Sequence, residues 1–245
     1  MKKEHQIKSH DGGSFMAYAA YPEGELPAPA VVVIQEIFGV NEVMRGICDN
    51  LARAGFIAIC PDIFWRQEPG IQLTDKSEEE WKRAFELFKG FDVDLGIEDL
   101  KSTLGFVRED KNCTGKAGTI GFCLGGKLAY LMSTRSEADC NVSYYGVGIE
   151  ELLDEAENID KHLLMHIAEK DKFVPMSAQE KILGALNRHN FVELHVYAGV
   201  DHAFAREGGE HYDKEAAHMA NSRTSDFLAT HLAKGKKGKK AHVGT

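Results

Sequence analysis

A cysteine enclosed by glycines is the feature of this sequence best suited to covalent chemistry. An apolar run at 119–122 leads to Cys123, Gly125 and Gly126 follow, and residues 127–132 favour a helix. This pattern predicts a nucleophile elbow, Gly-x-nucleophile-x-Gly, whose strained turn between strand and helix holds the reactive side chain above a sheet. The first helical turn would stabilise a thiolate through its unpaired N–H groups and its dipole. We therefore predict that Cys123 is a nucleophile; the alternative is a small buried apolar residue, as lone cysteines often are.

An acid and a histidine follow the elbow in an order that suits hydrolysis. Asp171 comes after a strand predicted at 162–168, and His202 after a strand predicted at 191–197. Nucleophile, acid, histidine is the chain order of α/β-hydrolases. In this arrangement His202 takes the thiol proton and later activates water, while Asp171 fixes the tautomer and stabilises the imidazolium. Taken singly, His202 could be a surface-loop residue and Asp171 a turn residue, and Asp201 is a rival acid.

The end of an earlier strand supplies further polar groups. The β-branched run at 30–34 predicts a strand buried on both faces, and Glu36 and Ile37 follow it directly. The backbone N–H groups of Leu124 and Ile37 are the natural oxyanion hole of such an elbow. An anionic Glu36 would oppose a developing oxyanion unless it were paired with a cation or engaged with the thiol of Cys123.

The elements needed to position these groups alternate between strand and helix. Such alternation predicts a mainly parallel central sheet with helices on both faces, so that the strand ends converge on one edge. Together with the elbow and the chain order of the triad, it indicates an α/β-hydrolase fold. We expect residues 1–233 to form a single domain, followed by a basic, disordered tail at 234–245. Pro27 and Pro29 are expected to stop strand pairing. The other predicted elements are an edge hairpin (5–10 and 14–21), a helix that Asn41 caps and Gly55 ends, strands at 56–60 and 141–146, and helices at 74–89, 94–110, 149–157, 177–189 and 210–232.

Composition limits the kinds of partner. With 245 residues, 43% hydrophobic residues and a net charge of −9, the chain suits a globular protein and disfavours nucleic acid as its main partner. It has no apolar run of membrane-spanning length and no signal-peptide pattern, which predicts a cytoplasmic protein. Five cysteines without close pairing indicate neither a disulfide framework nor a metal motif. His162 and His166 are four apart on a strand, so we interpret them as packing or surface histidines.

The loop at 61–65 is rich in apolar and aromatic residues. It could form the wall of a pocket or simply pack at the rim of the core, and the sequence favours neither.

At the level of motifs the sequence resembles the dienelactone hydrolase family, also called carboxymethylenebutenolidases, over roughly residues 5–233. The resemblance implies the triad Cys123, Asp171 and His202, with Glu36 beside the nucleophile and Arg206 as a carboxylate-binding residue. The matching segments are Gln35-Glu36-Ile37-Phe38-Gly39, Gly121-Phe122-Cys123-Leu124-Gly125-Gly126, Tyr144-Tyr145-Gly146, Asp171 before Val174-Pro175, and His202-Ala203-Phe204 followed by Arg206. Phe38 and Tyr145 are the other substrate-binding residues that this resemblance implies.

One position departs from the family pattern. The family usually has a second arginine near the start of the helix before the elbow, where this chain has Trp81 with Lys82 and Arg83 adjacent. The departure leaves the preferred lactone open.

A thiolate attacks an enol-type ester well, and the enolate leaves easily. We therefore predict a hydrolase that opens a small unsaturated lactone through a cysteine thioester, without metal or cofactor. Its partner would be an anionic small molecule, not nucleic acid or membrane, and we expect a monomer or weak homodimer.

Three other functions stay open. A broader carboxylesterase of small esters is the nearest, and a redox sensor or a binding scaffold would keep the fold without this chemistry. A sensor normally has a resolving cysteine, and no sequence argument brings Cys60, Cys113 or Cys140 near Cys123. A scaffold would not need all three triad members.

Overall fold

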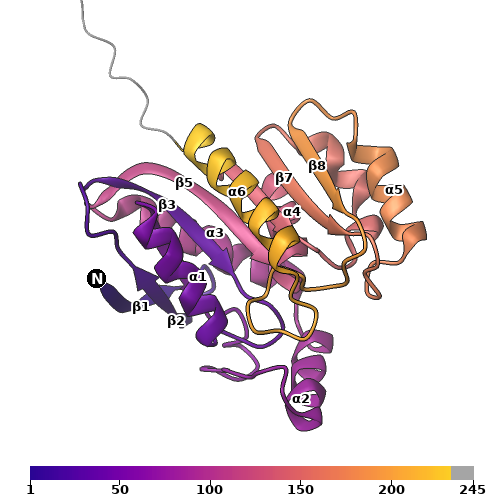
Figure 1. The fold of residues 1–245 in the computed structure, drawn as a ribbon. Helices are drawn as coiled ribbons and strands as arrows, with labels where there is room; N and C mark the ends of the chain where they lie inside the picture. Colours follow the sequence, from indigo (N-terminus) through magenta and orange to yellow (C-terminus); the bar gives the residue numbers. More distant parts are fainter. Residues whose placement is uncertain (233–245) are drawn as a thin grey trace, which may run out of the picture.

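A computed structural model describes residues 1–232, and the basic tail expected at 234–245 lies outside the described residues. One eight-stranded sheet runs through the described part in the order β1-β2-β4-β3-β5-β6-β7-β8 (Figure 1). β2 pairs antiparallel with β1 and β4, and every other pair is parallel. The strands are β1 (Lys2–Lys8), β2 (Ser14–Ala20), β3 (Ala28–Ile34), β4 (Ile57–Pro61), β5 (Cys113–Phe122), β6 (Cys140–Tyr144), β7 (His162–Ala168) and β8 (Val192–Tyr197).

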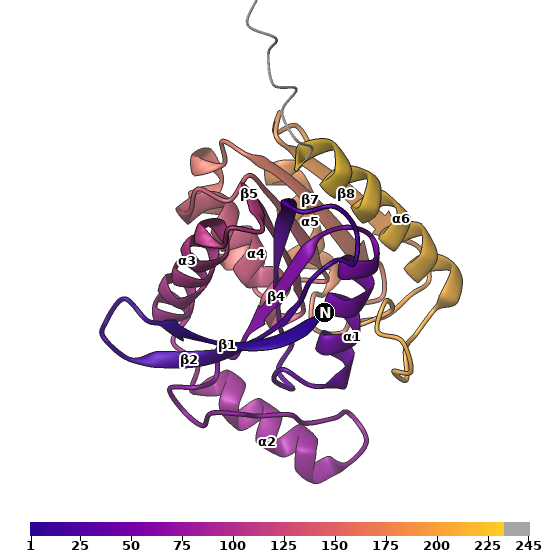
Figure 2. The ribbon, with the colours of Figure 1, turned by 90° about the vertical axis from the view of Figure 1, so that its left-hand side faces the viewer.

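Helices cover both faces of this sheet. Figure 2 shows α1 and α6 on one face and α3 and α4 on the other, while α2 lies apart, beyond the end of the sheet. The predicted fold class, a mainly parallel sheet with helices on both faces, is confirmed. The helices are α1 (Glu42–Arg53), α2 (Glu78–Lys89), α3 (Val93–Glu109), α4 (Leu124–Arg135), α5 (Met176–Leu186) and α6 (Lys214–His231), with two 3₁₀ turns, η1 (Ile149–Glu151) and η2 (Leu153–Asn158). Within the described residues, no helix has the length and apolar character needed to cross a membrane.

The central strand β3 determines where a site can form. Its residues 30–34 are fully buried, as expected for a strand covered by helices on both faces. β4 pairs with one side of β3 and β5 with the other, so the direction of strand succession reverses there. Ligands of open α/β sheets bind outside the carboxyl ends of the strands at such a reversal.

Helix α2 begins four residues later than predicted. Ser77 caps it, because its hydroxyl accepts the N–H of Glu80, so the helix starts at Glu78. Thr74 instead donates its N–H and its hydroxyl to the carboxylate of Glu80, at 2.8 and 2.6 Å. The segment before α2 is therefore a loop with defined contacts, and one of its residues reaches the site described below.

Three other helices differ clearly from the prediction in their bounds or type. The helix predicted at 177–189 ends at Leu186. Asp213 caps the last helix, which starts at Lys214 and not at residue 210. The helix predicted at 149–157 consists of the two short 3₁₀ turns.

The prediction for Pro29 was wrong. β3 begins at Ala28 and runs through Pro29, where the register against β5 shifts between Ala28 and Ala30. Proline has no N–H to donate to a regular ladder, so it is tolerated where the ladder is interrupted, as it is here.

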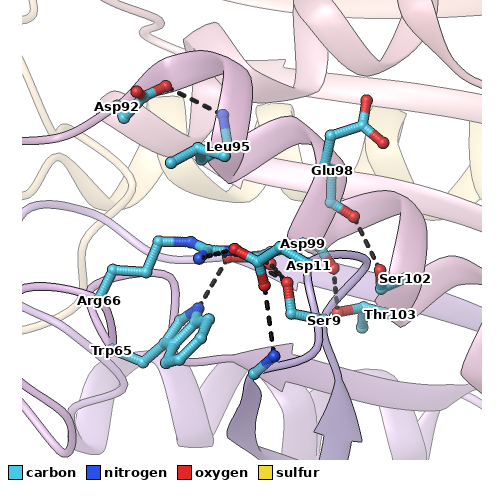
Figure 3. A network of polar contacts seen from close by, with 11 residues as sticks. Ser9, Asp11, Trp65, Arg66, Asp92, Leu95, Glu98, Asp99, Ser102 and Thr103 are labelled. Carbon is cyan, nitrogen blue, oxygen red and sulfur yellow. Dashed lines mark hydrogen bonds and ion pairs between the residues drawn. The ribbon is translucent and has the colours of Figure 1, made fainter.

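A buried carboxylate, Asp99 on α3, ties the first hairpin to the loop after β4 (Figure 3). Its Oδ1 accepts from Ser9 Oγ at 2.7 Å and from Arg66 Nη2 at 2.9 Å. Its Oδ2 accepts from Trp65 Nε1 at 2.8 Å and from Arg66 Nε at 3.2 Å. In the same loop Ile63 and Phe64 are buried in the hydrophobic core, and no residue of 61–65 lines the pocket described below.

We expect Asp99→Ala to lower the free energy of unfolding by about 2–4 kcal/mol, because Ser9 and Trp65 lose their acceptor and Arg66 keeps only its ion pair with Asp11. Urea denaturation measures the change. Asp160→Ala is the control, since it removes an exposed carboxylate paired only with Lys161 and should cost less than about 1 kcal/mol. Equal losses in the two variants would contradict the importance of this network.

Candidate active site

The elbow around Cys123 has the strained geometry that the sequence predicts. Cys123 has φ 56° and ψ −114°, a left-handed region that residues with a side chain rarely occupy. Its N–H donates to the carbonyl of Tyr144 at 3.1 Å, which holds the turn against β6. A Cβ on Gly121 would lie 1.8 Å from the carbonyl oxygen of Gly125, so only glycine fits there. Cys123 thus occupies the N-cap position of α4 at the carboxyl end of β5, without a capping hydrogen bond from its side chain.

An acid and an imidazole from two other strand ends are hydrogen-bonded to each other. Nδ1 of His202 lies 2.8 Å from Oδ2 of Asp171. The other oxygen of Asp171 accepts the N–H groups of Phe173 and Val174 at 2.8 and 3.2 Å, which fixes the orientation of the carboxylate. Nε2 of His202 is buried and has no hydrogen-bond partner within the described protein. The ring is therefore anchored on one side and available on the other, within the pocket that Cys123 also lines.

The rival acid, Asp201, does not contact the ring of His202. Its Oδ1 accepts the backbone N–H groups of His202 and Lys172, at 2.7 and 3.2 Å. Its Oδ2 lies 3.1 Å from Nζ of Lys172. Asp201 therefore shapes the loop and leaves the imidazole to Asp171.

Electrostatics favour a charged imidazole at this place. Burial lowers the pKa of His202, but a thiolate at Cys123 and the carboxylate of Asp171 would outweigh this effect, and together they raise that pKa to about 10. A thiolate and an imidazolium would thus stabilise each other here.

Glu36 and Arg206 form a buried ion pair beside the elbow. Nε of Arg206 donates to Oε2 of Glu36 at 2.8 Å, and the two side chains are 8% and 2% exposed. Oε1 of Glu36 is buried and has no hydrogen-bond partner in the described residues. The carboxylate of Glu36 and its neighbours raise the pKa of Arg206 further above its ordinary value despite burial. Of the two arrangements expected for Glu36, pairing with a cation or engagement with the thiol of Cys123, the structure shows the first, with Arg206 as the cation.

A small apolar pocket of about 50 Å³ connects these groups. Arg206 is the only cationic side chain among the described residues that line it, apart from the ionisable His202. Most of the wall is aromatic, and three of the aromatic rings come from α2. The lining residues are Ile37, Phe38, Trp81, Phe85, Phe88, Cys123, Val147, Phe173, His202 and Arg206. A larger cavity of about 620 Å³ lies between α1 and α6, but none of the predicted site residues lines it.

The remaining predicted residues are divided between the pocket and its support. Phe38 lines the pocket, and its ring lies 5.0 Å from Cζ of Arg206. Tyr145 is 2% exposed and packs edge-on against His202, 5.1 Å between ring centres, so it supports the imidazole and does not line the pocket. Ile37 is in the lining, and Leu124 is the first residue of α4, where N–H groups lack helical partners.

The structure also locates the residues at the position where the family usually has a second arginine. Trp81 lines the pocket and stacks on Phe85 with ring centres 5.6 Å apart. Lys82 is exposed, and Arg83 pairs with Glu86 at 3.0 Å on the outer side of α2. Neither cation is part of the pocket lining.

Sequence reasoning missed five contributors to the site: Asp75, Phe85, Phe88, Val147 and Phe173. Phe173 packs edge-on against His202 at 4.9 Å and is 45% exposed. The signal in the sequence was the apolar stripe of Trp81 and Phe85 on a strongly charged helix. In the structure Phe85 is 36% exposed, so this stripe is not fully used by core packing.

His162 and His166 on β7 are packing residues. His166 is buried, with Nδ1 2.8 Å from the hydroxyl of Tyr197 and Nε2 2.9 Å from Oγ1 of Thr224. His162 stacks on His231 with ring centres 4.0 Å apart. Among the described residues no three His, Cys, Asp or Glu side chains are arranged to hold a metal ion.

The sheet order and the elbow define an α/β-hydrolase. The family model described as the dienelactone hydrolase family matches residues 15–232. The chain is 53% identical to a protein of Azospirillum brasilense provisionally named a carboxymethylenebutenolidase, over 92% of this chain and 97% of that one. It is 37% identical to the carboxymethylenebutenolidase of Pseudomonas putida, over 91% and 94% of the two chains.

A solved structure agrees with these sequence matches. A crystal structure from Klebsiella pneumoniae, provisionally described as a dienelactone hydrolase, is similar with a TM-score of 0.82 and 28% identity, covering 96% of this chain and 99% of that one. This chain belongs to the dienelactone hydrolase family and is a hydrolase of carboxylic ester bonds.

Proposed function

We propose that this protein opens small unsaturated lactones, of the kind that gives its family its name, through a thioester on Cys123. The observation that carries the proposal is the imidazole of His202, anchored by Asp171 at 2.8 Å, with its other nitrogen buried and unpartnered in the pocket that Cys123 lines. A buried unpaired nitrogen costs free energy unless a thiol, substrate or water engages it. Its position beside a strained cysteine is suited to proton transfer.

The first half of the reaction forms the thioester. His202 takes the thiol proton, and the thiolate of Cys123 attacks the lactone carbonyl to give a tetrahedral intermediate. The N–H groups of Leu124 and Ile37 stabilise the oxyanion of that intermediate. The intermediate collapses with cleavage of the C–O bond of the lactone, and the enolate leaves with the proton that His202 carries.

Acylation itself prepares the second half. Because the charge of a thiolate at Cys123 helps to raise the pKa of His202, its loss in the thioester lowers that pKa, so that His202 gives its proton to the departing enolate and is neutral when the second half begins. The neutral imidazole then activates a water molecule, which hydrolyses the thioester and restores the thiol. No step of this route requires a metal or a cofactor.

Glu36 is a second candidate proton acceptor. Its Oε1 lacks a partner, while Oε2 is held by Arg206. If an incoming carboxylate competes for Arg206, Glu36 becomes free to accept the proton of Cys123, which would link substrate binding to nucleophile formation.

Incubation with a panel of enol lactones and aryl esters tests this function. Rapid turnover of conjugated enol lactones, with slower turnover of simple aryl esters, is the expected result. The aromatic pocket wall gives some support to the alternative of a broad small-ester hydrolase, and that alternative predicts the reverse ranking. Absence of turnover with every ester would overturn both.

A redox sensor is disfavoured by the positions of the other cysteines. None of Cys48, Cys60, Cys113 and Cys140 lines the pocket, and three of the four are fully buried. Cys123 therefore has no resolving cysteine at the pocket in the described part of the chain.

We expect Arg206→Ala to lower the preference for a carboxylate-bearing lactone over its neutral methyl ester by about one to two powers of ten, because one charged contact is lost. The measurement is kcat/KM for both substrates in wild type and variant. Arg83→Ala is the control: it removes a cation from α2 that does not line the pocket, and it should leave the ratio unchanged. An unchanged ratio in Arg206→Ala would remove this residue from substrate recognition.

A further inference from the structure

The guanidinium of Arg206 is held by a second carboxylate, which comes from a distant part of the chain. Nη1 of Arg206 donates to Oδ2 of Asp75 at 3.0 Å, in addition to the contact of Nε with Glu36. Asp75 lies in the loop before α2, 131 positions away in the sequence, and its side chain is 11% exposed. Arg206 therefore binds the carboxylate of Asp75 through Nη1 and the carboxylate of Glu36 through Nε.

Asp75 also has partners other than Arg206. Its Oδ1 lies 3.2 Å from Nζ of Lys76, and its backbone carbonyl accepts the indole N–H of Trp81 at 3.2 Å. Lys76 Nζ in turn donates to the carbonyl of Gly208 at 2.8 Å. The loop is thus attached to the segment that follows Arg206, and Trp81 links it to the pocket wall.

The balance of charge decides which carboxylate an incoming acid would displace. One guanidinium faces two carboxylates, so a third meets net negative charge unless one of the two withdraws. Glu36 is 2% exposed and would be left buried without a cation, which is costly unless it takes the proton of Cys123. Asp75 is nearer to solvent and retains the ammonium of Lys76, which is 64% exposed. Asp75 is therefore the carboxylate that can exchange without a proton transfer.

We propose that Asp75 is a specificity-determining residue, an internal carboxylate that competes with the substrate carboxylate for Arg206. This inference rests on the proposed role of Arg206 in substrate binding. Its consequence is that Asp75 weakens the binding of acids without affecting neutral esters, and so broadens the range of substrates that the pocket accepts.

Binding of a conjugated acid and its neutral amide, measured by calorimetry, tests the proposal without any turnover. We expect Asp75→Asn to bind sorbate about tenfold more tightly than the wild type does, because a competitor for Arg206 loses its charge. Binding of sorbamide should not change. Glu79→Gln is the matched control, since it removes one negative charge from an exposed position on α2, and it should bind both compounds as the wild type does.

Equal or weaker sorbate binding by Asp75→Asn would overturn the proposal, because it would mean that Asp75 positions Arg206 and does not compete for it. If Asp75→Asn melts at a lower temperature than the wild type, Asp75→Ser provides the same comparison. Loss of sorbate binding in Arg206→Ala, together with tighter binding in Asp75→Asn, supports competition even if no lactone is hydrolysed. Sorbate binding that survives Arg206→Ala instead contradicts the role of Arg206 on which the inference rests.

Discussion

Cys123→Ala is expected to lower kcat/KM for an enol lactone by roughly 10⁴-fold or more, since enzymes that lose their nucleophile retain only the catalysis of the oxyanion hole and of binding. The wild type, quenched during turnover, should carry the mass of the acyl group on the peptide that contains Cys123. The strained backbone at this residue, φ 56°, fits a role in which the sulfur must be presented to a substrate. Full esterase activity in the alanine variant would sink the assignment.

Cys113 provides the matched control for this experiment. It is the most accessible of the other four cysteines, and it lies at the start of β5, away from the pocket. Cys113→Ala should retain both the activity and the adduct. An adduct found on Cys113 in the wild type would show that labelling follows exposure and not catalysis.

The parts of the site that follow from the sequence are those that depend on local pattern and on parallel pairing. Burial on both faces makes β3 a continuous apolar run, and glycines mark the elbow after β5. Because β3 and β5 are parallel neighbours, Glu36 and Cys123, which follow them, must lie at the same edge of the sheet. The same reasoning brings Asp171 and His202 to this edge from β7 and β8.

The parts that could not be predicted depend on contacts between distant segments. Nothing in the sequence near Asp75 indicates that its carboxylate meets a guanidinium 131 positions away. The hydrogen bonds of Asp99 with Arg66, 33 positions apart, are of the same kind. Such pairings depend on how loops pack after the sheet has formed, and hydrophobic periodicity carries no information about them.

The predicted starts of α2 and α6 were wrong for a more local reason. Residues 74 and 210 both begin charged, helix-favouring segments, and the periodic pattern alone does not say where the first turn forms. In the structure Ser77 and Asp213 take the capping positions, because their side chains accept N–H groups of the first turn. For α2 the difference matters, since it leaves Asp75 in a loop that can approach Arg206.

The second large effect concerns the cooperation of Asp171 and His202. We expect His202→Ala to lower kcat by roughly three to five powers of ten, and Asp171→Ala by somewhat less. The double variant should be no worse than His202→Ala alone, since Asp171 acts through the imidazole that it holds at 2.8 Å. Kinetics of the two single variants and the double variant measure the coupling.

A titration separates this cooperation from a structural role of the acid. Asp171 helps to raise the pKa of His202, so Asp171→Asn should lower that pKa, whereas Asp201→Asn should have a smaller effect because Asp201 bonds only to the backbone of His202. Proton NMR of the imidazole follows both variants against pH. If the losses of kcat are additive and the pKa of His202 does not change in Asp171→Asn, then Asp171 only supports its loop through the N–H groups of Phe173 and Val174. If the pKa falls and the losses overlap, the hydrogen bond to Nδ1 is the means by which the acid contributes to catalysis.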